Sequence, residues 1–403
     1  MRHFEYMQND IFYKIPEHFT KWDDPKELAY SLGATLYMPG TLPKLDEVIQ
    51  NRKYPDLTSL VIDLEDAVGD DDLLVAEDLV ITTIEKIFDN YLLDSSILEN
   101  MPLVFIRVRN PEQLQRLIQK IGEKQVVLTG YVFPKFGVEV GAKYFAMLAE
   151  TAQQYTLKIY GMPILETPDV IYKERRLENL FAIKELLNEY REHVLNVRIG
   201  ATDFCGIYGI RRRADSTIYD ISIIRDCMTD IINVFRRQPD AYVISGPVWE
   251  YFSNQRVLKP MLRQTPFLNK GAIDQRQAIL DEYIDGLVKE VLLDKQNGIL
   301  GKTIIHPTHI RFVHGLYAVT HEEYCDAVSI MEHNNGSKGV LKSQYENKMN
   351  EMKPHSFWAE QIIMRAKFYG VLNESEDFTT LLLNSDGEMD ADRSVQTTIT
   401  DFR

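Results

Sequence analysis

Eight short apolar runs recur along the chain, and most successive runs end thirty to forty residues apart. The first run ends in a Pro-Gly turn, and polar or charged residues close the others, which is typical of buried parallel strands that end at a loop. The runs span residues 34–40, 59–68, 102–111, 129–137, 157–168, 194–204, 240–247 and 301–309. Eight strands alternating with helices close a barrel, so the pattern predicts an α/β protein with a (β/α)8 TIM-barrel fold.

Segments with apolar residues at helical spacing lie between the runs. Barrel helices are predicted at 72–88, 111–122, 138–155, 175–190 and 218–237. The longest interval precedes the last run, and it leaves room for an insertion around Trp249 to Lys270 before a helix from Asp274 to Gln296. Two more helices, at 322–331 and 356–370, are expected after the barrel and are joined by a polar loop.

These elements divide the chain into four parts. We expect an N-terminal lead-in at 1–33, a catalytic barrel at 34–310, a C-terminal helical extension at 311–373 and an acidic, mobile tail at 374–403. The extension and tail are favoured over a separate second domain.

Composition narrows the functional class. Of 403 residues, 45% are hydrophobic and 26% are charged, as in ordinary globular proteins. A net charge of −15 argues against a nucleic-acid partner, because phosphates require a basic face. The N-terminus does not resemble a signal peptide, and no apolar run approaches the roughly 20 residues that span a bilayer. We therefore expect a cytoplasmic protein with a small-molecule substrate and no membrane contact.

The three cysteines are too few and too widely spaced for a disulfide framework or a zinc site. Cys205 follows Asp203 by two residues and is a candidate nucleophile. A small buried packing residue is the favoured alternative, because free cysteines usually have that role.

Two acids at strand ends predict a metal site. Glu166 closes one run, and Asp203 closes the next, thirty-seven residues further along. That spacing accommodates one strand, one helix and two loops, so both carboxylates are expected at the same end of the sheet. Two hard oxygen ligands at one place suit Mg²⁺ or Mn²⁺.

Charged or ionisable residues close several of the other runs as well. In a barrel such residues form one constellation, because the active site lies at the carboxyl ends of the strands. The predicted set is Glu65, Asp66, Arg107, Lys135, Glu166, Asp203 and His306. For any single member, a solvated loop start is an equally good interpretation. A charge partner is favoured over a Schiff base for Lys135, and a structural histidine over a catalyst for His306.

Arg211, Arg212 and Arg213 form the only basic triplet in the chain. They follow Asp203 and could clamp a phosphate of a nucleotide-like substrate. Pairing with surface acids at the start of a helix is an equally good interpretation.

Several short motifs occur in an order that resembles the HpcH/HpaI aldolase and citrate lyase beta-subunit superfamily. They are DLEDAV at 63–68, Arg-Val at 107–108, Pro-Lys at 134–135, Leu-Glu-Thr at 165–167, Gly200 to Asp203 and GKTIIHPTHI at 301–310. The resemblance covers roughly residues 34–370. It is strongest to the divergent carbon-carbon bond lyase branch associated with tellurite-resistance and stress-response gene clusters.

The resemblance implies specific roles for these positions. Glu166 and Asp203 would hold Mg²⁺, Arg107 would bind a carboxylate or carbonyl oxygen of the substrate, and Glu65 would orient Arg107 or metal-bound water. A divalent ion opposite an arginine suits the cleavage of a carbon-carbon bond beside a carbonyl, because that step leaves an enolate. Lys135 is a further candidate for substrate binding. Relatives form trimers or hexamers, so the resemblance also implies a homo-oligomer.

Two stretches depart from the family pattern. The helix after DLEDAV begins Gly69-Asp70-Asp71-Asp72, where relatives often carry basic residues that suit coenzyme A. The run ending at Ser245 lacks the acid that is common there, so the general base is unassigned.

We therefore expect a Mg²⁺-dependent carbon-carbon bond lyase or aldolase that acts on a small oxo-acid or acyl substrate, with or without a phosphate, through a metal-stabilised enolate. The alternatives are a condensing enzyme or thioester hydrolase at the same site, or a non-catalytic barrel that serves as a scaffold in a stress-response complex.

Overall fold

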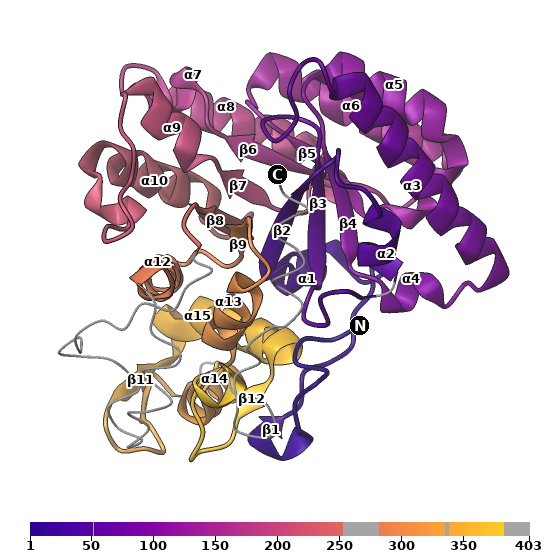
Figure 1. Cartoon of the computed structure of the whole chain (residues 1–403). Helices are drawn as coiled ribbons and strands as arrows, with labels where there is room; N and C mark the ends of the chain where they lie inside the picture. Colours follow the sequence, from indigo (N-terminus) through magenta and orange to yellow (C-terminus); the bar gives the residue numbers. More distant parts are fainter. Residues whose placement is uncertain (51, 253–281, 335–337, 383–403) are drawn as a thin grey trace.

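Eight parallel strands close into a barrel in the computed structural model, which describes residues 1–50, 52–252, 282–334 and 338–382. The strands are β2 (Ala34–Pro39), β3 (Ser59–Asp63), β4 (Leu103–Arg107), β5 (Gly130–Phe133), β6 (Tyr160–Leu165), β7 (Val197–Ile199), β8 (Ile244–Trp249) and β9 (Lys302–Ile304). They pair in chain order, and β9 returns to β2 (Figure 1). The predicted TIM barrel is confirmed.

Helices connect the strands and cover the outside of the barrel (Figure 1). They are α2 (Leu45–Gln50), α3 (Leu73–Leu93), α4 (Ile97–Asn100), α5 (Pro111–Ile121), α6 (Val138–Tyr155), α7 (Pro168–Ile171), α8 (Arg176–Glu189), α9 (Ala201–Ile207), α10 (Ser222–Phe235) and α12 (Glu282–Gln296), with short 3-10 turns η2 (Gly122–Val127), η3 (Arg191–His193) and η4 (Ile218–Asp220). All five predicted barrel helices are present. The segment predicted as one helix at 218–237 is divided into η4 and α10.

Local sequence explains where these helices begin and which face they bury. In α5 the side chain of Asn110 accepts a hydrogen bond from the backbone of Gln113 at 2.9 Å, and Pro111 takes the first helical position. Both features favour a helix start. Leu114 and Leu117 then follow at helical spacing and are buried against the barrel.

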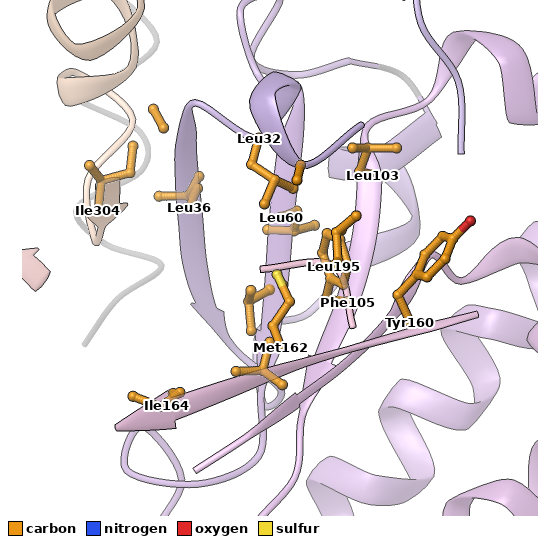
Figure 2. Close-up of a cluster of buried hydrophobic side chains, with 14 of the residues drawn as sticks. Leu32, Leu36, Leu60, Leu103, Phe105, Tyr160, Met162, Ile164, Leu195 and Ile304 are labelled. Atoms are coloured by element: carbon orange, nitrogen blue, oxygen red, sulfur yellow. The ribbon is translucent and has the colours of Figure 1, made fainter. Parts of the chain in front are cut away.

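The core lies inside the strands and between the strands and helices. In β3 and β4 every residue is buried, which explains why these strands read as continuous apolar runs rather than alternating ones. Figure 2 shows part of this core, where Leu36, Leu60, Phe105 and Met162 come from four different strands.

The C-terminal extension packs against the N-terminal lead-in. The extension contains α13 (His309–Tyr317), α14 (His321–His333), a hairpin of β10 (Val340–Lys342) and β11 (Met349–Glu351), α15 (Met352–Tyr369) and β12 (Val371–Leu372). The lead-in contains η1 (Asn9–Ile11), β1 (Phe12–Lys14) and α1 (Pro25–Ser31). β1 pairs with β12 in antiparallel orientation (Figure 1). The lead-in and the extension therefore form one joint structure beside the barrel.

Strand β8 differs from its prediction, and two predicted segments fall largely outside the described residues. The seventh run does not end near Ser245, because β8 continues through a bulge to Trp249. Residues 253–281, which hold most of the predicted insertion and the start of the helix predicted from Asp274, lie outside the described residues, as does most of the predicted mobile tail, 383–403. Of the tail that is described, η6 (Thr380–Leu382) buries Leu381 and Leu382.

None of the helices in the described ranges has both the length and the hydropathy to cross a membrane.

Candidate active site

A cavity of about 700 Å³ opens at the carboxyl end of the barrel. Its lining comes from every barrel strand or following loop except β5, and includes five members of the predicted constellation: Asp66, Arg107, Glu166, Asp203 and His306. The other two members, Glu65 and Lys135, form ion pairs with these residues. The structure therefore brings all seven predicted residues to one place.

Glu166 and Asp203 form a closely coupled acid pair in this cavity. Glu166 directly follows β6 and is 3% exposed, whereas Asp203 lies in the first turn of α9 rather than at the end of β7. The two carboxyl groups lie close enough for the charge of Asp203 to act on Glu166. Burial and the Asp203 charge raise the pKa of Glu166 to about 8, and burial also raises the pKa of Asp203 although Lys135 opposes it. Two acids held this closely repel each other when both are ionised, so the pair favours a shared proton or a cation.

Gly200 makes room for this acid pair. A Cβ at Gly200 would lie 1.9 Å from Oε2 of Glu166 and 2.6 Å from its Cβ. No side chain fits at that separation, so the close approach of Glu166 to the end of β7 requires glycine.

Lys135 connects the acid pair to the rest of the site. Its backbone N–H donates to Oε1 of Glu166 at 2.7 Å, from a left-handed conformation with φ 47°. Its Nζ donates a hydrogen bond to Oε1 of Glu65 and lies 3.9 Å from Oδ1 of Asp203. Desolvation lowers the pKa of Lys135, but Glu65 and the neighbouring acids outweigh that effect and raise it above the ordinary value. A lysine held in its protonated form is a charge partner rather than a Schiff-base nucleophile.

Arg107 is held by acids on several sides. Nε and Nη2 donate to the two carboxylate oxygens of Asp63 at 2.7 and 2.6 Å. Nη1 lies 2.8 Å from Oε2 of Glu65 and 3.3 Å from Oδ2 of Asp66. Glu65 thus lies where it can orient Arg107, as expected. Nε and Nη2 of Arg107 are taken by Asp63, and Nη1 also has acidic neighbours, so the substrate-binding role of Arg107 stays a prediction.

Sequence reasoning missed Asp63 and Arg198. Asp63 is the last residue of β3 and also accepts hydrogen bonds from the backbone of Glu65 and Ala67, at 3.0 and 3.2 Å. Arg198 lies inside β7 and lines the cavity. Both are charged residues within runs that were interpreted as apolar strands. A charge inside a fully buried strand is the signal that could have identified them.

The structure does not bring the arginine triplet together as a clamp. Arg212 is buried, and its Nη1 donates to both carboxylate oxygens of Glu290 at 2.6 and 2.8 Å. Arg213 is exposed and pairs with Asp215 at 3.3 Å, whereas Arg211 and Arg212 both line a second, smaller cavity of about 330 Å³ beside α9. The surface-pairing interpretation therefore fits Arg213, and Arg212 has a structural partner.

The two remaining candidates are His306 and Cys205, and both have neighbours that are typical of structural residues. Nδ1 of His306 is 2.8 Å from the hydroxyl of Thr308, and its ring stacks on Phe252 at 4.7 Å. Cys205 is 5% exposed, and burial raises the pKa of its thiol. This environment suits a packing residue and disfavours a nucleophile. The acid that follows the seventh barrel strand is Glu250, which accepts a hydrogen bond from Thr202 at 2.8 Å.

The acid pair fits Mg²⁺ or Mn²⁺. Within the described ranges, no group of three or more His, Cys, Asp or Glu side chains is arranged to hold a metal ion. Mg²⁺ commonly uses only one or two protein carboxylates and completes its shell with water and substrate oxygens. Glu166 and Asp203, which both line the cavity and have raised pKa values, provide that donor set.

Comparison with known proteins identifies the family. A model of the C-C bond lyase family of the TIM-barrel fold matches residues 26–371. No curated protein sequence matches the chain.

Remote likenesses to solved structures extend over most of the chain. RipC from Yersinia pestis is 16% identical and has a TM-score of 0.45, covering 73% of this chain and 99% of its own. CitE from Mycobacterium tuberculosis, solved with magnesium, acetoacetate and coenzyme A, is 16% identical with a TM-score of 0.48, covering 84% and 99%. Malate synthase from Haloferax volcanii, in a pyruvate and acetyl-CoA complex, is 12% identical with a TM-score of 0.45, covering 69% and 68%.

Proposed function

Because the chain belongs to the C-C bond lyase family of the TIM-barrel fold, we propose that it is a Mg²⁺-dependent lyase or aldolase. The substrate is a small oxo acid or acyl compound, and it binds in the cavity at the barrel mouth. The size of the cavity, about 700 Å³, suits a small molecule.

The observation that carries the proposal is the acid pair of Glu166 and Asp203. Two carboxyl groups with raised pKa values are costly to keep ionised side by side in a buried place. A divalent cation removes that cost, and a purely structural role offers no reason for the arrangement.

Mg²⁺ bound at this pair would act as a Lewis acid toward an oxygen of the substrate. The protein's own residues supply the surrounding charge. Breaking a carbon-carbon bond beside a carbonyl leaves an electron pair on that fragment, as an enolate. Nη1 of Arg107 and the protonated Nζ of Lys135 lie at the same mouth and favour that negative charge.

Glu65 is a positioning residue for both cations. Its two oxygens contact Arg107 and Lys135, and it is only 7% exposed. Asp63 fixes the plane of the Arg107 guanidinium through its bidentate contact. Arg107 and Lys135 are therefore held in place before a substrate binds, which is the condition for electrostatic stabilisation of the transition state.

Calorimetric titration with Mg²⁺ tests the proposal. Glu166→Gln and Asp203→Asn should lose Mg²⁺ binding, because each removes one of the two charged ligands. Asp169→Asn is a matched control, since Asp169 is an exposed acid three residues after Glu166 and does not line the cavity. If Glu166→Gln binds Mg²⁺ as tightly as the parent does, the metal site is elsewhere.

A further inference from the structure

Arg198 is a buried cation whose hydrogen-bond donors are poorly matched. Arg198 is only 1% exposed. Nη2 donates to the hydroxyl of Thr303 at 2.7 Å, and Nη1 is 3.9 Å from the sulfur of Met162, which is a weak acceptor. Nε is buried without a hydrogen-bond partner. A guanidinium with five N–H groups thus has one good acceptor.

The other buried arginines have acidic partners. The pairs are Arg107 with Asp63 at 2.6 Å, Arg176 with Asp230 at 2.8 Å, Arg212 with Glu290 at 2.6 Å and Arg365 with Glu323 at 3.9 Å. Among buried arginines in the described parts of the chain, Arg198 alone has no carboxylate within 4.0 Å. Its guanidinium lies 5.6 Å from the centre of the Tyr37 ring, but a contact of this kind offsets only part of the cost of removing a charge from water.

Arg198 faces the cavity from a deeper level than the acid pair. Its backbone pairs in register with Ile164 of β6, and Glu166 lies two residues beyond Ile164, directly after the end of β6, or roughly 7 Å further at the usual rise per residue. Met162, Thr303 and the Tyr37 ring, which are its side-chain neighbours, are uncharged, and Arg198, Thr303 and Tyr37 all line the cavity. A bound molecule that reaches the cavity floor therefore meets a positive charge there.

We propose that Arg198 binds a carboxylate of the substrate at the floor of the cavity, so that the substrate carries an acidic group below the one that reacts at the mouth. The inference rests on the proposed function, because it defines the substrate on which that function acts. It also assigns carboxylate recognition to Arg198 rather than to Arg107, whose fork is occupied by Asp63. A planar guanidinium with free N–H groups is the side chain best suited to a carboxylate.

Binding of malonate, succinate and glutarate, each beside its monomethyl ester, tests the proposal with the full chain and Mg²⁺. The parent should bind at least one diacid on the order of ten- to a hundredfold more tightly than its ester, because the ester removes one charged acceptor. Arg198→Met should lose that difference. Arg176→Met removes an equally buried arginine away from the cavity and should keep it. An equal preference for the diacid in Arg198→Met and the parent, or no preference in the parent, overturns the proposal.

Thermal unfolding separates a ligand-binding role from a structural one. Without ligand, Arg198→Met should melt at the same temperature as the parent or higher, because it removes an unpaired buried charge. Arg176→Met should melt at a lower temperature, because it leaves Asp226 and Asp230 without their shared partner. A loss of stability in Arg198→Met as large as that in Arg176→Met would show that Arg198 serves the fold instead. Mg²⁺ titration of the ligand-free parent reports separately on the proposed function.

Discussion

Gly200 is the residue on which the position of Glu166 depends most directly. Gly200→Ala would place a methyl group in the space that the Glu166 carboxylate occupies. Mg²⁺ affinity should fall on the order of ten- to a hundredfold, as when the support of a metal ligand is removed. Calorimetry with Gly206→Ala as the control measures this, because a Cβ at Gly206 meets nothing within 4 Å although Gly206 lies on α9, the short helix that Gly200 precedes. Equal Mg²⁺ affinity in the two variants would contradict the assigned geometry.

Much of the candidate site could be predicted at the residue scale, because the carboxyl ends of parallel strands always meet at one face. Glu166, Asp203 and Arg107 were found in this way. Asp63 and Arg198 were not, since a charged side chain within an apolar run gives no sign of which partner it will meet. The left-handed backbone of Lys135 was also hidden, because lysine has no preference for that conformation.

The loop and helices after α9 decide the role of the arginine triplet. Arg212→Met should destabilise the fold by about 3 kcal/mol, because it leaves the fully buried Glu290 with one cation fewer. Arg211→Gln and Arg213→Gln should change stability by less than about 0.5 kcal/mol, since both side chains are exposed. Urea unfolding of the three variants measures these differences. Similar small effects in all three would mean that the Arg212 and Glu290 pair contributes nothing to stability.

Element ends were harder to predict than elements. Helix α6 begins and ends where its apolar spacing indicated, whereas α3 continues five residues beyond the predicted end at Phe88. Strand β8 continues past Ser245 because a bulge lets the chain pass Gly246 and Pro247 without leaving the sheet. The hairpin of β10 and β11 was missed, since its residues alternate only weakly between apolar and polar.

At the scale of the whole molecule, three buried histidines predict a loss of stability in mild acid. Burial lowers the pKa of His3 and of His309 to about 3, and it lowers the pKa of His314 well below the ordinary value. All three are neutral in the folded chain, whereas the unfolded chain takes up a proton at each near pH 6.5. Stability is therefore complete above about pH 6.5 and is lost as the pH falls toward 3, by about 1.4 kcal/mol per pH unit for each histidine.

Urea unfolding of the parent and of His3→Gln at several pH values between 7 and 4 measures this effect. His3→Gln should remove the contribution of one histidine to the slope of the unfolding free energy against pH. The unfolding free energies of the parent and the variant should therefore converge as the pH falls. Parallel curves would contradict the neutral state of His3 in the fold. His333→Gln, at the end of α14 where the side chain is less buried, is the control.

The complete barrel could be predicted because eight similar strand-and-helix units repeat along the sequence, and each repeat supports the interpretation of the others. The joint structure of the two ends could not. β1 and β12 have three and two residues, and they meet across more than three hundred and fifty positions of sequence. Pairs so short leave no periodicity to detect. The four-part division of the chain stays a prediction.

The most direct test of the account is Mg²⁺-dependent exchange of the methyl protons of pyruvate with deuterium, followed by NMR. Exchange reports enolate formation and does not require the natural substrate. The account predicts exchange by the parent with Mg²⁺, little exchange without it, and none above background in Glu166→Gln. Exchange at the parent's rate in Glu166→Gln would contradict the assigned site. No exchange by the parent with pyruvate, oxaloacetate or acyl thioesters would contradict the lyase itself and favour a non-catalytic barrel.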